Sequence, residues 1–132
     1  MTFSEVRVLV ADGSKSKEQD VSLNLESGGI VVRDGKGDQI VKALPYQSVL
    51  SATYSESKRP QWKAAAGVAG VPSAFGGSGS LLGRSRHWLV LQSKDDFLIL
   101  RLEKENVAKI LPAIESRTGV QVQTVVIKSD TK

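Results

Sequence analysis

Residues 21–44 read VSLNLESGGIVVRDGKGDQIVKAL, and they hold three strand patterns separated by two turn patterns. In the first pattern, at residues 21–25, apolar and polar side chains alternate, which is typical of an antiparallel strand with one buried face. The turn sequences SGG and DGKG contain glycine, which adopts the positive φ that tight hairpin turns need. Together with the strands expected at 30–33 and 39–44, this stretch predicts a meander of antiparallel strands.

Strand patterns continue on both sides of this meander. Before it, valines alternate over residues 6–10, and the polar run GSKSKEQD at 13–20 is expected to be a loop. After it, further strand patterns lie at residues 48–54, 87–91, 97–102 and 120–127. So many antiparallel strands predict a sheet that curls into a barrel or sandwich, because open strand edges are unfavourable.

One segment near the C-terminus changes from the period of a strand to that of a helix. Its apolar residues are spaced i, i+3, i+4 and i+7, which makes one stripe of an amphipathic helix: Val107, Ile110, Leu111 and Ile114. Gly119 is placed to end this helix in the left-handed conformation. Pro112 lies inside it, and we expect a bend or a break there because proline removes a main-chain hydrogen bond.

The composition excludes several kinds of chemistry. The chain has 132 residues with no cysteine, one histidine and a formal net charge of +4. This is the length of one domain, whose stability must come from packing and hydrogen bonds. Thiolate metal sites, an ordinary zinc site and a cysteine nucleophile are all excluded. No basic region followed by an apolar run stands at the start, so we expect a cytoplasmic protein.

Residues 57–86 interrupt the strand patterns with a basic, apolar and glycine-rich segment. No acidic residue occurs between Glu56 and Asp95. The uncharged stretch at 64–83 approaches the length of a membrane span, but it is too rich in glycine and serine to be one. We predict an interaction loop made of Lys58, Arg59, Trp62, Lys63, Val68, Val71, Phe75, Leu81, Leu82, Arg84 and Arg86.

Three roles fit this loop. Its apolar side chains could enter the surface of an anionic membrane while the flanking cations meet lipid phosphates, and Trp62 suits such an interface. It could instead form a protein interface, including one between copies of this chain. In the third case it folds back over the domain, or is partly disordered, and contacts nothing else.

The order of elements resembles the pleckstrin-homology (PH) superfold, and more narrowly the bacterial PH-like domains. The residues that carry the resemblance are GGIVVRDGKGDQIVKALPYQSVLSATYS and HWLVLQSKDDFLILRLEKENVAKILPAIESRTGVQV, within residues 21–122. The resemblance implies a mainly β fold, a seven-stranded antiparallel barrel or sandwich capped by one C-terminal helix, to which an extra C-terminal strand is added. We expect a single domain at 1–127, with 57–86 as an insertion between strands five and six, and a disordered tail at 128–132.

The same resemblance implies a non-catalytic binding or scaffolding module that needs no cofactor and no metal. Some PH domains bind phosphoinositides through basic residues on the first two strands and their loop. Here Lys15 and Lys17 are expected in that loop, but the second strand, DVSLNLE, has no basic residue. Specific phosphoinositide binding is therefore not expected, and neither is specific nucleic-acid binding, since the basic segment has few aromatic residues to stack on bases.

We expect the partner to be a protein or an anionic membrane surface, which would place the chain in the cytoplasm or peripherally at the inner membrane. The alternatives are a self-assembling structural module that forms homo-oligomers through the same loop and, least favoured, a small enzyme.

Three further residues receive structural roles. His87 has no predictable carboxylate or nucleophile beside it, so we interpret it as structural or exposed and not as a base. Trp88 is expected in the core or at the mouth of the barrel. Tyr46, directly after Pro45, is expected to close a turn, although Tyr46 or Tyr54 could also stack on a ligand.

Overall fold

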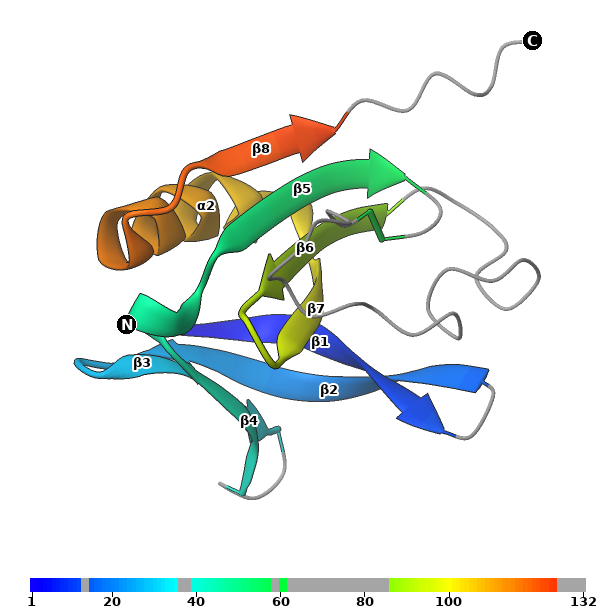
Figure 1. Cartoon of the computed structure of the whole chain (residues 1–132). Helices are drawn as coiled ribbons and strands as arrows, with labels where there is room; N and C mark the ends of the chain where they lie inside the picture. The colour runs from blue at the N-terminus through cyan, green and yellow to red at the C-terminus, as the bar shows by residue number, and fades with distance from the viewer. Residues whose placement is uncertain (13–14, 36–38, 58–59, 62–85, 126–132) are drawn as a thin grey trace, which may run out of the picture.

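The computed structural model describes residues 1–12, 15–35, 39–57, 60–61 and 86–125 of the chain (Figure 1). The elements follow one another as β1 (Thr2–Asp12), β2 (Lys15–Leu25), β3 (Gly29–Asp34), β4 (Ile40–Pro45), η1 (Tyr46–Ser48), β5 (Ser51–Ser57), β6 (Arg86–Gln92), β7 (Phe97–Leu102), α2 (Lys104–Thr118) and β8 (Val122–Val125).

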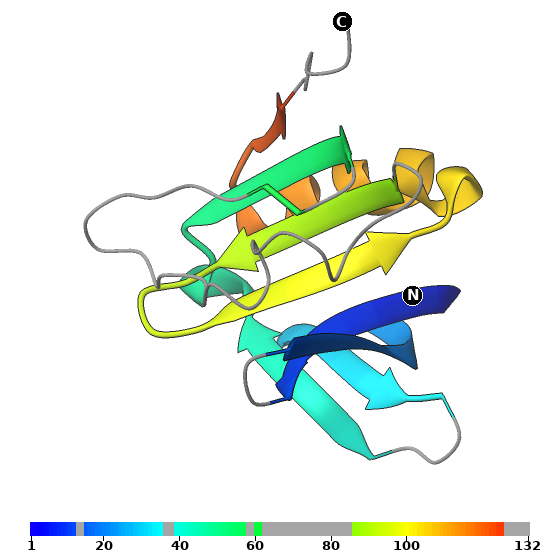
Figure 2. The ribbon, with the colours of Figure 1, turned by 90° about the vertical axis from the view of Figure 1, so that its right-hand side faces the viewer.

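The strands form one eight-stranded sheet in the order β4-β3-β2-β1-β7-β6-β5-β8. All neighbours are antiparallel except β5 and β8, which are parallel. The sheet bends sharply, so that β1–β4 and β5–β7 form two layers, and α2 covers β5–β7 from one side only (Figures 1 and 2). The mainly β fold with one C-terminal helix is therefore confirmed, and the extra C-terminal strand pairs with β5.

The polar stretch at 13–20 is mostly strand and not the predicted loop. β2 begins at Lys15 and pairs with β1 along its whole length, with Lys17 opposite Val10 and Asp20 opposite Arg7. Hydrogen bonds to β1 satisfy its backbone, while Lys17 and Asp20 keep exposed side chains. Strand formation here depends on the partner strand, which the local sequence does not reveal.

The hairpin at residues 27–29 forms as predicted, but its glycines have a different role. The Glu26 amide donates to the Gly29 carbonyl at 3.0 Å. Among the described glycines only Gly119 has a positive φ, so the expected positive φ at this turn is wrong. Gly29 is needed for space, because a Cβ there would lie 2.6 Å from the Leu44 carbonyl oxygen on β4.

The fifth strand begins later than predicted. Residues 46–48 form the short helix η1, in which the Val49 amide donates to the Tyr46 carbonyl, and β5 then runs from Ser51. β5 ends at Ser57 and β6 begins at Arg86. Most of the predicted insertion between them, and the predicted tail at 128–132, lie outside the described residues.

Helix α2 is continuous through Pro112, so the alternative of a break is wrong. Pro112 and Ala108, whose carbonyl loses the proline as a donor, are both exposed, and water can therefore bond to that carbonyl. Gly119 ends the helix with φ 75° and donates to the Glu115 carbonyl, as predicted. The helix buries Ile110 and Ile114 from the predicted stripe and also Ala113, with Val107 and Leu111 packed partly buried against the core.

One hydrophobic core fills the space between the two layers and α2. It takes side chains from all the strands of both layers and from the helix, including Leu23, Ile30, Leu89, Leu100 and Ile110. Each of these side chains is fully buried.

Strand β1 contributes to this core on both sides of a β-bulge. The bulge lies between Phe3 and Val6, and Glu5 there has φ 59°. The Ser4 carbonyl at the bulge accepts a hydrogen bond from Asn106 at 3.0 Å, which attaches the first turn of α2 to β1.

Candidate functional site

The two layers of the sheet meet where β1 pairs with β7, and they separate beyond that point. Among the described residues the recorded pairs are Arg7 with Arg101 and Val8 with Leu100. Past Val8, β1 is paired with β2, and before Leu100, β7 is paired with β6. A gap therefore opens between β1 and β7, because each strand is paired here only with its other neighbour, β2 or β6.

A cavity of about 240 Å³ occupies this gap, and we call it the seam pocket. The described residues that line it come from β1, β4 and β7 and are apolar apart from one lysine: Val8, Leu9, Val10, Val41, Lys42, Phe97, Leu98 and Ile99. Val8 and Leu98 belong to the main core, whereas Leu9 and Ile99 belong to a second apolar cluster. The seam pocket thus lies between two packed clusters.

Lys42 gives the seam pocket its charged group. Its ammonium lies 2.6 Å from Asp96 Oδ1 and 5.2 Å from the centre of the Phe97 ring. The Phe97 amide donates to the same Oδ1 at 2.8 Å. Burial alone would raise the pKa of the Asp96 carboxyl, but the hydrogen bonds from Lys42 and from the Phe97 amide hold that pKa below its ordinary value. The Asp96 carboxyl is therefore ionised at neutral pH.

A second ionic group joins the layers on the other side of the seam. Glu18 Oε1 accepts from Arg101 at 2.6 Å and from Arg7 at 3.2 Å, and Arg7 also contacts Asp20 at 2.9 Å. The hydrogen bond to Glu18 raises the pKa of Arg7, which stays charged. Since Glu18 lies on β2 and Arg101 on β7, this carboxylate holds the two layers together where the strand pairing ends.

The outer face of β5–β7, which points away from the main core, is itself buried. Its apolar cluster contains Leu9, Trp88, Val90 and Ile99, with Phe97 packed against it. Figure 2 shows α2 behind these strands and, among the described elements, no helix or strand in front of them.

Small residues of β5 lie beside the large ones of β6 on this face. Ser55 pairs with Trp88, and Thr53 pairs with Val90. The Trp88 indole donates to the Ser57 carbonyl at 3.0 Å, so its polar atom is satisfied.

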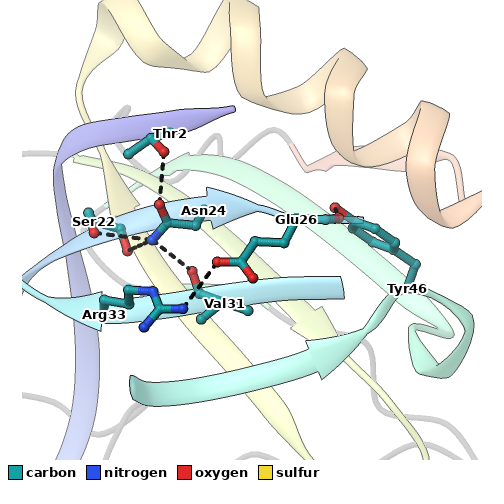
Figure 3. A network of polar contacts seen from close by, with 7 residues as sticks. All are labelled: Thr2, Ser22, Asn24, Glu26, Val31, Arg33 and Tyr46. Atoms are coloured by element: carbon teal, nitrogen blue, oxygen red, sulfur yellow. Dashed lines mark hydrogen bonds and ion pairs between the residues drawn. The ribbon is translucent and has the colours of Figure 1, made fainter. Parts of the chain in front are cut away.

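A network of polar contacts lies on the outer face of β1–β3, as Figure 3 shows. Asn24 accepts from the Thr2 hydroxyl at 2.9 Å and donates to Ser22 Oγ at 3.2 Å and to the Val31 carbonyl at 3.4 Å. At the end of this face Arg33 contacts Glu26 at 3.2 Å. The Glu26 carbonyl also accepts from the Tyr46 hydroxyl, which ties η1 to the hairpin as the predicted turn-closing role of Tyr46 requires.

Most of the predicted interaction loop lies outside the described residues, namely Lys58, Arg59, Trp62, Lys63, Val68, Val71, Phe75, Leu81, Leu82 and Arg84. Arg86 is described as the first residue of β6, where it pairs with Ser57. It is half-buried, and its Nε is buried without a hydrogen-bond partner. The relation of Arg86 to the other predicted loop residues lies outside the described residues.

The predicted structural roles of His87 and Trp88 are consistent with their contacts. His87 Nδ1 shares a 2.7 Å hydrogen bond with the Tyr54 hydroxyl, and the two rings stack at 6.1 Å between centres. Burial, with a smaller contribution from Glu56, raises the pKa of the Tyr54 hydroxyl. Trp88 is 1% exposed but belongs to the outer cluster and not to the main core.

The described residues offer neither a metal-binding cluster nor a membrane-spanning helix. No group of three or more His, Asp or Glu residues that could hold a metal ion occurs among them. None of the described helices is long and apolar enough to span a membrane.

The seam pocket was not predicted from the sequence, although one signal for part of it is present there. Residues 97–100 read FLIL and are apolar without alternation, which is typical of a strand buried on both faces. The other walls of the pocket depend on where the pairing of β1 with β7 ends and on where β4 lies next to these two strands. Neither of these positions follows from the local pattern.

No protein-family model matches the sequence, and no curated protein matches it. Among solved structures, the chain is similar to one in the structure of the Spt16D–Pob3N heterodimer. That match has a TM-score of 0.60 and 9% identity, and it covers 100% of this chain and 57% of that chain. A weaker similarity, with a TM-score of 0.45 and 13% identity, is to the hSac2 domain from human phosphoinositide phosphatase Sac2. It covers 99% of this chain and 80% of that chain.

The first similarity shows the fold. The chain has a PH-like fold, in agreement with the architecture expected from the sequence. At this identity the similarity does not extend to activity, and the chain spans little more than half the length of the chain that it matches.

Proposed function

We propose that this chain is a non-catalytic PH-like module that binds a protein partner through the seam pocket. The observation that carries the proposal is an apolar cavity of about 240 Å³ that opens between β1 and β7 with the Lys42–Asp96 ion pair beside it. The PH-like fold, which is similar to that of a chain from the Spt16D–Pob3N heterodimer, is consistent with such a role.

The size of the pocket favours a protein side chain over a separate small molecule. Sites for drug-sized ligands measure roughly 300–1,000 Å³, whereas an apolar cavity of about 150 Å³ is enough to hold a benzene ring. At about 240 Å³, the seam pocket suits one large apolar side chain or two smaller ones. Protein interfaces are commonly anchored by such a side chain in a desolvated pocket.

The surroundings of the pocket match the usual plan of an interface. An apolar centre with a polar rim is typical of protein–protein contacts. Here Lys42 and Asp96 supply charged groups, and their side chains are 31% and 42% exposed, so both reach solvent. A partner segment can therefore place an apolar anchor in the pocket and polar groups beside it.

The polar side chains near the pocket support a non-catalytic role. Glu18 is engaged by Arg7 and Arg101, and Asp96 is engaged by Lys42. Catalysis of acid–base type needs a group that is available to a substrate, and these carboxylates already have cationic partners.

The experiment is to select binders from a library of random peptides displayed on phage and to map a selected peptide by NMR. We expect selected peptides to share one large apolar residue and to shift the amide signals of residues 8–10, 41–42 and 97–99. The Val41→Trp variant fills the pocket and should weaken binding by about tenfold or more, as expected at an anchor pocket. The matched control is Val31→Trp, which places the same indole on the outer face of β3.

Two results would overturn the proposal. One is a failure to select any peptide that binds the purified chain. The other is a peptide that shifts signals elsewhere and binds equally well to Val41→Trp. Val10→Phe, which narrows the pocket by a smaller change, serves if Val41→Trp fails to fold. Binding to anionic vesicles without any peptide binding would favour the membrane role instead.

A further inference from the structure

The seam pocket has a carboxylate-binding group beside it, and this group points to the chemistry of the partner. Asp96 Oδ1 receives the Lys42 ammonium at 2.6 Å and the Phe97 amide at 2.8 Å. An ammonium and a main-chain amide that converge on one oxygen make a receptor for a carboxylate. In the free chain the carboxylate in this receptor is the chain's own.

The turn that presents Asp96 is held in place independently of its side chain. The Ser93 amide donates to the Asp96 carbonyl at 2.8 Å, and the Asp96 amide donates to Ser93 Oγ at 3.0 Å. Lys42 also contacts the Phe97 ring through its charge, at 5.2 Å from the ring centre. Both the turn and the lysine therefore keep anchoring contacts if the Asp96 carboxylate leaves.

The charge around the pocket favours an acidic segment. Lys17 lies opposite Val10 of the pocket wall and so shares its face, and Lys94 lies in the turn before β7. Both lysines are exposed, and no ion pair is recorded for either in the described part of the chain. Around the pocket and seam the basic residues Arg7, Lys17, Lys42, Lys94 and Arg101 outnumber the acidic residues Glu18, Asp20, Asp95 and Asp96, so the net charge here attracts anions.

Replacing the Asp96 carboxylate on Lys42 by another carboxylate costs little free energy. The side chains of Lys42 and Asp96 are 31% and 42% exposed, so their pair is partly solvated and contributes little to stability. A partner carboxylate that is already held close by an apolar anchor competes at a high effective concentration.

We propose that Lys42 selects partner segments in which an aspartate or glutamate lies next to the apolar anchor, and that the partner's carboxylate replaces Asp96 on Lys42. This inference rests on the proposed function, because it assigns a specificity to the seam pocket. Asp96 then acts as an internal competitor that weakens the binding of acidic segments.

The test compares two versions of a pocket-binding peptide, one with an acidic residue beside the anchor and one with the matching amide. For the acidic peptide, Lys42→Gln should weaken binding by about fivefold to tenfold, the size of one charge-assisted hydrogen bond, while the amide peptide is unaffected. Asp96→Asn should strengthen binding of the acidic peptide several-fold, because it removes the competitor. Lys104→Gln on α2 is the control for the loss of one positive charge. Calorimetric titration measures each affinity.

The outcome separates this inference from the proposed function. If Lys42→Gln changes the two peptides alike, or if Asp96→Asn does not strengthen binding of the acidic peptide, the inference is wrong. The proposed function would still stand in that case, provided that Val41→Trp blocks both peptides. If no peptide binds the pocket, both fail. If Lys42→Gln instead weakens binding to anionic vesicles alone, the lysine serves a membrane surface, which also overturns the inference.

Discussion

The outer faces of the two sheet layers have opposite character. The outer face of β1–β3 carries a network of polar side chains, in which Asn24 bonds to Thr2 and to the Val31 carbonyl and Arg33 contacts Glu26 (Figure 3). On β5–β7 the outer face is closed to solvent, and Val90 and Ile99 are 0% exposed. Both layers contribute their inner faces to the same core, so the difference concerns only the sides that point away from it.

One-sided and two-sided burial are encoded by different sequence patterns. Strand β2 alternates as VSLNL, whereas β6 and β7 carry the unbroken apolar runs WLVL and FLIL. A strand with one wet face needs apolar residues at every second position, and a strand buried on both faces needs them throughout. The unbroken runs therefore mark the layer whose outer face is part of the protein's packing.

The largest expected effect tests whether the outer face of β5–β7 is a true packed core. Ile99→Ala should lower the free energy of unfolding by about 3 kcal/mol, the usual cost of emptying a well-packed aliphatic site. Val31→Ala on the outer face of β3 is the matched change and should cost less than about 1 kcal/mol, because that site is partly exposed. Urea unfolding measures both, with an unchanged dependence on denaturant. Equal losses would mean that the two faces do not differ.

The sequence predicted the fold well because its strands and helix have strong local periodicity. The meander, the strand at 97–102 and the helix with its stop at Gly119 all follow from patterns within a few residues. The predictions failed where pairing with a distant strand decides the structure. The polar start of β2 is extended because β1 lies beside it, and η1 replaces the expected start of β5.

The candidate site could be predicted only in part. The run FLIL indicated two-sided burial at β7, but the seam pocket also needs Val41 and Lys42 from a strand at the edge of the sheet. Lys42 and Asp96 are 54 residues apart in the sequence, and neither local sequence pattern predicts that they form an ion pair. The interaction loop predicted within residues 57–86 lies mostly outside the described residues.

The next effect concerns the ionic contact between the layers. Glu18→Gln should lower the free energy of unfolding by about 1–2 kcal/mol, since it removes a charged acceptor from two arginines. Its side chain and that of Arg101 are 23% and 22% exposed. Asp20→Asn is the control, because Asp20 contacts Arg7 but is 81% exposed, and its loss should cost less than about 0.5 kcal/mol. A larger loss for Asp20→Asn than for Glu18→Gln would show that the contact of Asp20 with Arg7 contributes more to stability than the contact between the layers.

A smaller effect should appear as a dependence on pH at the seam pocket. The pKa of Asp96 is lowered in the folded chain, so the pair with Lys42 stabilises the fold above the unfolded pKa, and this stability is lost as the pH falls through the lower, folded pKa. The contribution should be less than about 1 kcal/mol because both side chains are partly solvated. Thermal unfolding between pH 6 and pH 2 should show a smaller acid destabilisation for Asp96→Asn than for the natural chain. Parallel pH profiles would exclude this contribution.

The smallest expected effect comes from the exposed polar face of β1–β3. The ion pair between Arg33 and Glu26 joins side chains that are 31% and 46% exposed, so its coupling energy in a double-mutant cycle should be about 0.2–0.5 kcal/mol. The same cycle for Arg101 and Glu18 should give a larger coupling, because that pair is less exposed and its distance is 2.6 Å against 3.2 Å. The cycle cancels what each arginine does elsewhere, so the two couplings can be compared directly. If the Arg33–Glu26 pair coupled as strongly as the Arg101–Glu18 pair, solvent exposure would not explain the difference between their coupling energies. The polar face of β1–β3 would then contribute to stability as much as the ionic contact between the layers.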